Sequence, residues 1–265
     1  MKANLLKIVL PAVLAVGFNA TTTQLHASFI QLGQTNYLQN FDTLPSSGKA
    51  KVTIPGWAIA EFGNMDQQIQ ADNGSMSLGG AYSYGRTGSN NRAMGTLNDG
   101  MGNYAYFGAD FQNTGHGSIH GLNVSFTGEE WRLGRAGVQN TLAFQYSLNA
   151  GSLTSGTWIN VPSLSFTTPN TVGVGAHDGT LASNERQIAS TISFLNIPVG
   201  STFWIRWLEN TPSDKHAPGD GLAIDNFSIS AVPEASTVLG SIVAVVLCAL
   251  ALRGQGRSAK TVLPA

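Results

Sequence analysis

Residues 201–209 read Ser-Thr-Phe-Trp-Ile-Arg-Trp-Leu-Glu, and this stretch decides the fold class. Alternate residues along a strand point to opposite faces of its sheet. One face therefore carries Phe203, Ile205 and Trp207, and the other carries Trp204, Arg206 and Leu208. Since both faces are largely apolar, the pattern predicts a central strand that is covered on both sides.

The chain on either side of this strand contains further short strands and punctuating turn residues. Leu142, Phe144, Tyr146 and Leu148 alternate with other residues in a period of two. Other strands are expected near 37–42, 102–111, 119–127, 158–166 and 187–194. No window between the chain termini has a 3.6-residue period, and Gly, Asn, Ser and Pro recur between the strands. We therefore expect an all-β fold, a two-sheet sandwich in jelly-roll form, flanked by an N-terminal signal helix and a C-terminal transmembrane helix.

An irregularity is expected in the last strand. Leu222 and Ile224 share one parity, whereas Phe227 and Ile229 share the other. Because one inserted residue restores the inward direction of an apolar series, the change of parity predicts a β-bulge near Asp225 and Asn226.

The C-terminal region combines a short polar motif, an apolar segment and a basic tail. Val232-Pro233-Glu234-Ala235-Ser236 precedes an uncharged stretch over 237–252, and the tail has cations at Arg253, Arg257 and Lys260. As a helix, residues 237–252 would rise about 24 Å, which approaches the roughly 30 Å of a bilayer core. A transmembrane helix with a cytoplasmic basic tail is expected. The alternative is a buried C-terminal helix of a soluble protein.

This arrangement resembles the PEP-CTERM sorting signal, here spanning residues 232–260. Pro233, Glu234 and Ser236 match the motif, while Ala235 stands where the motif has its second proline. The resemblance implies an exosortase-type processing enzyme as a partner. It also implies anchoring in the inner membrane during sorting, followed by delivery to the cell surface or extracellular matrix.

The N-terminus has the pattern of a secretory signal peptide over residues 1–27. Lys2 and Lys7 precede an apolar core at 8–18, and cleavage is expected before Ser28. Cleavage after Ala20 and a retained N-terminal anchor are the alternatives. The exported domain is then 28–231, a length that suits one all-β core.

The exported domain is acidic. It contains nine Lys and Arg but fourteen Asp and Glu, a net charge of −5, and the only cysteine of the chain, Cys248, lies in the apolar C-terminal segment. Nucleic acid is not expected as a partner, because phosphate binding requires clustered cations. Without a disulfide, the domain must be held together by its core, or by a core and a metal.

Several local sequences resemble a β-sandwich ectodomain found ahead of PEP-CTERM signals. They are QNFDTLP (39–45), GW (56–57), RAMG (92–95), VSFTGEEWR (124–132), FWIRW (203–207) and GLAIDNF (221–227). The resemblance implies a cell-surface or matrix protein. The resemblance brings no established activity with it, and a non-catalytic structural or adhesive domain is expected.

A calcium site is the most specific chemical prediction. Asp214, Asp220 and Asp225 fall in a Gly-rich segment that leads into the last strand, and Asp42 lies in the first predicted strand. Carboxylate oxygens are ligands that Ca²⁺ prefers, and these four aspartates are predicted to hold a structural Ca²⁺. The alternative is a solvated turn in which Asp225 caps a backbone N–H.

Polysaccharide binding is the favoured role, with a stacking platform at Tyr82 and Tyr84, whose rings share one strand face. Trp57, Trp131 and Trp158 are further aromatic candidates. The alternatives are a glycan hydrolase and an inert matrix spacer. A hydrolase needs two acids about 5 to 10 Å apart. Glu129 and Glu130 cannot serve together, because adjacent strand residues face opposite sides, and an ion pair of Glu130 with Arg132 is expected instead.

Overall fold

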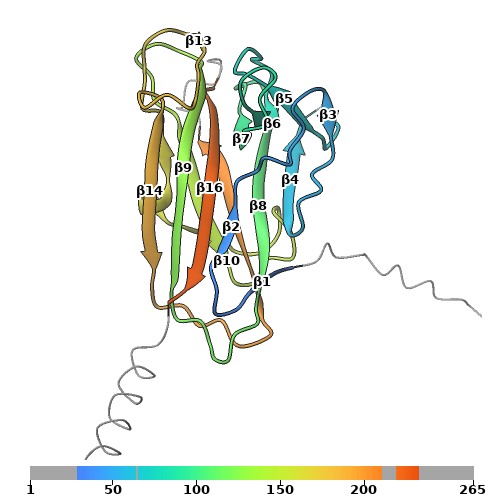
Figure 1. Cartoon of the computed structure of the whole chain (residues 1–265), viewed down its shortest axis with the longest axis vertical. Helices are drawn as coiled ribbons and strands as arrows, with labels where there is room; N and C mark the ends of the chain where they lie inside the picture. Colours follow the sequence, from blue (N-terminus) through green and yellow to red (C-terminus); the bar gives the residue numbers. More distant parts are fainter. Residues whose placement is uncertain (1–28, 64, 211–218, 233–265) are drawn as a thin grey trace, which may run out of the picture.

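Strand β15 (Thr202–Asn210) lies in the middle of a sheet, hydrogen-bonded to β8 on one side and β10 on the other. The computed structural model describes residues 29–63, 65–210 and 219–232, which form two facing β-sheets (Figure 1). The all-β sandwich and the central position of this strand, both expected from the sequence, are confirmed.

The first sheet has seven strands: β1 (Ile30–Leu32), β4 (Trp57–Phe62), β8 (Tyr104–Asn113), β10 (Thr141–Ser147), β11 (Ile159–Asn160), β12 (Phe166–Thr167) and β15. The second has nine: β2 (Tyr37–Gln39), β3 (Lys49–Ala50), β5 (Ile69–Asp72), β6 (Gly80–Tyr84), β7 (Ala93–Leu97), β9 (Leu122–Leu133), β13 (Gly175–Ala176), β14 (Glu185–Ile192) and β16 (Gly221–Ala231). Each sheet contains a parallel pair, β1 with β8 and β5 with β6. The expected jelly roll, an antiparallel architecture, does not account for these two pairs.

The core lies between the two sheets and is centred on Trp207, which has no exposed surface. Five aromatic rings have centroids 5.0–6.0 Å from it: Trp57, Phe107, Phe126, Phe144 and Phe227. Two of these, Phe126 on β9 and Phe227 on β16, come from the opposite sheet. Edge-to-face pairs of this kind stabilise a core beyond their buried area. Trp204, on the other face of β15, packs in a separate cluster with Ala150 and Leu153.

The predicted bulge in the last strand is confirmed. The register of β16 against β9 shifts between Asp225 and Ser228, and Asn226 has a φ of 49°. Leu222 and Phe227 are consequently both buried between the sheets although their parities differ. Asn is one of the few residues that adopts this left-handed conformation readily.

Two predicted strands are shorter or broken in the structure. The segment 158–166 splits into β11, a single 3-10 turn (Pro162–Leu164) and β12, because Pro162 lacks the N–H that a strand ladder needs and suits the start of a helical turn. Strand β2 ends at Gln39, and Phe41 has a φ of 57°.

The predicted signal peptide (1–27), residues Pro233 to Ser236 of the sorting motif, the apolar segment 237–252 and the basic tail lie outside the described residues. Val232 is described, and its N–H donates to the Gly121 carbonyl after β16 ends. Within the described ranges, no helix has the length and apolar character that crossing a membrane requires.

Candidate functional site

A groove of about 510 Å³ lies on the outer face of the nine-stranded sheet, across β14, β9 and β16. Asn123 on β9 is opposite Thr191 on β14 and Ser230 on β16. Ser125 is opposite Ser228 on β16, so a second polar row lies beside the first. Directly opposed strand residues point to the same face of a sheet, which places both rows on the surface.

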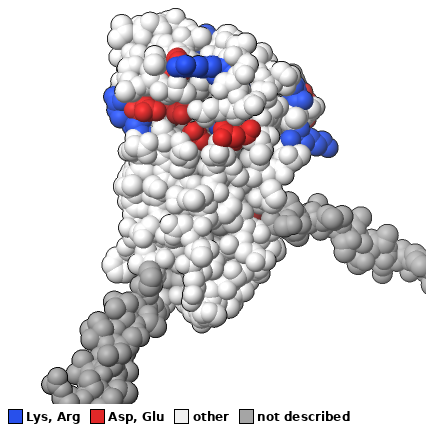
Figure 2. All heavy atoms as spheres, in the orientation of Figure 1, with Lys and Arg blue, Asp and Glu red and all other residues white. Residues whose placement is uncertain are grey.

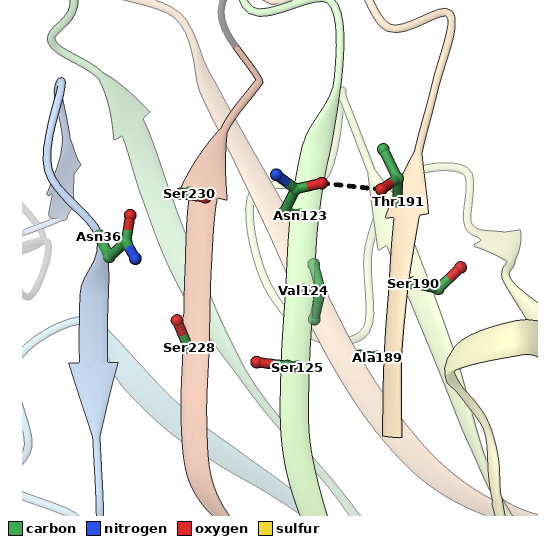
Figure 3. Close-up of a pocket in the computed structure, with 9 residues that line it drawn as sticks. All are labelled: Asn36, Asn123, Val124, Ser125, Ala189, Ser190, Thr191, Ser228 and Ser230. Atoms are coloured by element: carbon green, nitrogen blue, oxygen red, sulfur yellow. Dashed lines mark hydrogen bonds between the residues drawn. The ribbon is translucent and has the colours of Figure 1, made fainter. Parts of the chain in front are cut away.

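Figure 3 shows the groove with these side chains and with Asn36, which precedes β2. The Thr191 hydroxyl donates to the Asn123 side-chain oxygen at 2.7 Å. Asn36, Asn123 and Thr191 are exposed, and Ser125, Ser228 and Ser230 are partly exposed. Each hydroxyl offers a donor and acceptor sites, and each amide offers two donors and a carbonyl oxygen. The groove is therefore an array of uncharged hydrogen-bonding groups, with no aromatic residue among those that line it.

An acidic band crosses the same face beside the groove (Figure 2). Figure 2 shows the red side chains gathered across the upper part of this face, with an uncharged surface below them. Glu129 on β9 is opposite Glu185 on β14, and Asp225 on β16 is opposite Thr127. We define the acidic band by five residues: Asp42, Glu129, Asp178, Glu185 and Asp225.

Burial perturbs two carboxyls of the acidic band. Burial raises the pKa of Glu129 to about 8, against the hydrogen bond that Trp131 Nε1 donates to its Oε2 at 2.7 Å. Burial also raises the pKa of Asp225 to about 6, and the charge of Asp42 adds to the increase. Both groups stay protonated to a higher pH than ordinary carboxyls, because their charged forms are poorly hydrated.

Glu130 points away from Glu129, as expected for adjacent strand residues, but its predicted ion pair with Arg132 is wrong. Glu130 Oε1 lies 2.8 Å from Nδ1 of His177, and its Oε2 accepts a hydrogen bond from the Asn170 N–H. Arg132 Nη1 instead donates to the carbonyls of Gly74 and Ser75. His177 reaches Glu130 because it directly follows β13, which pairs with the end of β9, and its N–H donates to the Trp131 carbonyl.

The predicted stacking platform at Tyr82 and Tyr84 is wrong, because both rings are buried, with 2% and 0% of their surface exposed. They stack on one another at 5.1 Å, and Tyr84 stacks on Trp131 at 6.1 Å. These rings form a second hydrophobic cluster, which covers part of the outer face of the nine-stranded sheet. Trp57 is also buried, whereas Trp158 is partly exposed on the other sheet.

The four aspartates predicted to bind calcium do not converge within the described part of the chain. Asp42 and Asp225 are neighbours on the outer face. Asp220, however, precedes β16 and accepts hydrogen bonds from the Gly134 N–H and the Thr168 hydroxyl. Five residues of extended chain separate Asp220 from Asp225 by roughly 16 Å. Asp214 lies outside the described residues, and in the described ranges no three His, Cys, Asp or Glu form a possible metal-binding group.

Asp220 belongs instead to a buried polar cluster that could not be expected from the sequence. Glu209, at the end of β15, accepts hydrogen bonds from the Asn140 amide at 2.6 Å and from the Asp220 N–H at 3.1 Å. Burial raises the pKa of Glu209 well above its usual value. The carboxyls of Glu209 and Asp220 accept hydrogen bonds from three loops at one end of the sandwich. Their role is therefore structural.

A second groove, of about 320 Å³, is lined by the side chains around Asp72 and Arg92. Asp72 is the only carboxylic acid that lines it, and the groove at Asn123 has none. Neither of these two grooves therefore offers the pair of acids that a glycan hydrolase requires.

No family model matches the sequence, and no curated protein matches it. Among solved structures, the chain is similar to TmCBM61 in complex with beta-1,4-galactotriose, at a TM-score of 0.35 and 11% identity over 73% of this chain and 95% of that chain. It is also similar to the K2 cleaved adhesin domain of Lys-gingipain, at a TM-score of 0.41 and 12% identity over 76% and 100% of the two chains. At TM-scores this low, neither structure carries an argument about this chain.

Proposed function

We propose that this chain is an exported surface or matrix protein whose β-sandwich binds a neutral polysaccharide in the groove at Asn123. The observation that carries the proposal is the pair of uncharged polar rows, Ser230–Asn123–Thr191 and Ser228–Ser125. Sugars present hydroxyl groups that both donate and accept hydrogen bonds, and the groove offers the same two capacities on a fixed strand spacing. Because the longer row crosses three strands on an outer face, the ligand is an extended chain.

The charge of the protein surface around the groove determines which class of polysaccharide can bind there. The residues that line the groove are uncharged, while the acidic band lies beside them on the same strands. At neutral pH the ionised carboxylate of Asp225, whose pKa is about 6, would repel an anionic polysaccharide in the groove but not a neutral one. Since no aromatic ring lines the groove, hydrogen bonds supply most of the affinity, and a Kd on the order of 0.1–1 mM is expected.

The test is retention of the domain in native gels that contain a neutral polysaccharide such as galactan, xylan or glucan. The Asn123→Ala/Ser230→Ala variant removes one polar row, and we expect it to migrate faster than the wild type in the gel that retards the wild type. The control is Asn91→Ala/Ser89→Ala, which changes the same residue types in an exposed loop. Equal retardation of both variants, or no retardation of the wild type by any neutral polysaccharide, would overturn the proposal.

Export and sorting are a separate part of the proposal and are supported by the sequence of the two chain ends. We infer that a signal peptide directs the chain out of the cytoplasm and that an exosortase-type enzyme processes the motif at Val232–Ser236. The intact mass of protein recovered from the native envelope tests this. A chain that ends near Ser236 is the expected result, whereas a mass that retains Arg253, Arg257 and Lys260 contradicts processing.

A further inference from the structure

The outer face of the seven-stranded sheet carries a stripe of partly exposed aromatic side chains. Phe62 on β4 stacks on Tyr104 of β8 at 4.5 Å, and Tyr106 lies 4.9 Å from Phe62. Arg206 on β15 and Trp158, just before β11, continue the stripe. The registers of β4, β8 and β15 place the side chains from these strands on the face opposite Trp207 and the core.

Arg206 is held in a fixed position inside this aromatic stripe. Its guanidinium carbon lies 3.9 Å from the centroid of the Trp158 ring and 4.8 Å from that of Tyr106. Its Nε donates to the Gln145 side-chain oxygen at 2.7 Å, and its Nη1 donates to the Leu153 carbonyl. Stacking between aromatic rings orients the planar guanidinium and leaves one of its edges free for a ligand.

The charge of Arg206 is not neutralised within the described part of the chain. No carboxylate there forms an ion pair with Arg206, and Nη2 makes no hydrogen bond to the described residues. Arg206 is therefore a fixed cation without a carboxylate partner among the described residues, in a domain whose net charge is −5. A partly exposed guanidinium with a free edge is a suitable receptor for a planar carboxylate.

We propose that the aromatic stripe is a second polysaccharide site, which binds a carboxylated sugar unit of an acidic glycan. The carboxylate of the sugar pairs with Arg206, and the apolar C–H face of the sugar ring packs on Tyr104. This inference rests on the proposed function in so far as both ligands are polysaccharides, but it uses different residues on the opposite face. One domain would then hold a neutral chain on one face and an acidic chain on the other.

The test compares retention in native gels containing polygalacturonate, a polymer of carboxylated sugars, with retention in gels containing neutral galactan. Arg206→Gln is expected to weaken polygalacturonate binding about tenfold. Arg186→Gln is the matched control, since it removes the same charge from β14 on the other sheet and should bind as the wild type does. High salt should weaken wild-type binding to polygalacturonate and leave binding to neutral galactan unchanged.

A second variant protects the test if Arg206→Gln fails to fold, because Arg206 also supports the loop at Leu153. Phe62→Ala/Tyr104→Ala removes two rings of the stripe and leaves Arg206 and its hydrogen bonds in place, and it should also lose polygalacturonate binding. Wild-type retention by polygalacturonate that neither variant reduces would overturn the inference, as would no retention of the wild type. If polygalacturonate binding depends on Arg206 while no neutral polysaccharide binds, this inference stands and the groove proposal fails.

Discussion

Glu129 is a buried acid whose hydrogen bond to Trp131 does not compensate for the loss of hydration. Its pKa of about 8 in the folded chain exceeds the ordinary value of 4.5. Between these two values the folded state binds more protons than the unfolded state, so stability falls as pH rises from about 4.5 to about 8. Asp110, with a pKa of about 7 caused by burial, acts in the same direction.

The first prediction is that Glu129→Gln flattens this dependence. Glutamine keeps an oxygen that accepts from Trp131 Nε1 and carries no charge to desolvate. At pH 8 the variant should be more stable than the wild type by on the order of 2 kcal/mol. Urea unfolding at several pH values measures the effect, and Glu185→Gln, which keeps the buried acid, is the control. An unchanged slope of stability against pH in Glu129→Gln would contradict the assignment.

The second prediction concerns a single buried side chain, Tyr84. Its ring is fully buried against Trp131, and its hydroxyl is buried without a hydrogen-bond partner among the described residues. Tyr84→Ala should therefore lower the free energy of unfolding by about 3–5 kcal/mol. Tyr84→Phe should be neutral or raise it by about 1 kcal/mol, because it removes an unpaired polar atom. Thermal unfolding of both variants measures these changes in stability. A Tyr84→Phe variant less stable than the wild type would mean that the hydroxyl has a hydrogen-bond partner.

At the scale of the element, the bulge in β16 lets one strand serve both the core and the groove. It turns Phe227 and Ile229 inward and thereby leaves Ser228 and Ser230 on the outer face. Without the extra residue, a strand that continued the parity of Leu222 would expose the two apolar side chains and bury the two serines. The groove therefore depends on the conformation of Asn226.

The third prediction tests this dependence. Asn226→Val places a β-branched residue at a φ of 49° and should cost about 1–2 kcal/mol of stability. Asn226→Gly should have little effect, since glycine adopts this conformation freely. Ser230→Val, on regular backbone in the same strand, is the control for a change in side-chain type. Equal stability of Asn226→Val and the wild type in urea unfolding would show that the bulge tolerates a β-branched residue.

Sequence patterns predicted the strands in which apolar and polar residues alternate and missed strands without this alternation. The strands near 142–148 and 201–209 and the bulge could be predicted, because apolar parity is visible in the sequence. Strand β7 was missed, since all its residues are buried and small residues interrupt the pattern. Tyr82 and Tyr84 were placed on the surface because the ring that covers them, Trp131, comes from a distant strand.

The candidate site could not be predicted, for a related reason. Asn123, Thr191 and Ser230 are ordinary polar residues in the sequence, and only the register of β14, β9 and β16 brings them into one row. The aromatic stripe likewise depends on how β4 pairs with β8. The sequence favoured polysaccharide binding at Tyr82 and Tyr84, but both rings are buried and cannot form an exposed platform.

For the whole molecule, we propose a different ligand for each outer face of one sandwich. The nine-stranded sheet presents an uncharged groove beside the acidic band, and the seven-stranded sheet presents aromatic rings around Arg206. A domain that holds a chain on each face links two polysaccharides, and simultaneous engagement strengthens weak single contacts. This arrangement suits a matrix component, which must hold a network together by many weak contacts.

Binding of a neutral polysaccharide in the groove at Asn123 can be observed residue by residue in an NMR titration of the isotope-labelled domain. A short oligosaccharide of the polymer that retards the domain in gels would be added in steps. We expect shifts of the side-chain amide signals of Asn36 and Asn123 and of the backbone signals of Ser125, Thr191 and Ser228. Signals from Gln145 and Asn160, on the other sheet, should stay in place. Shifts confined to residues outside the groove, or none at saturating oligosaccharide, would contradict the claim.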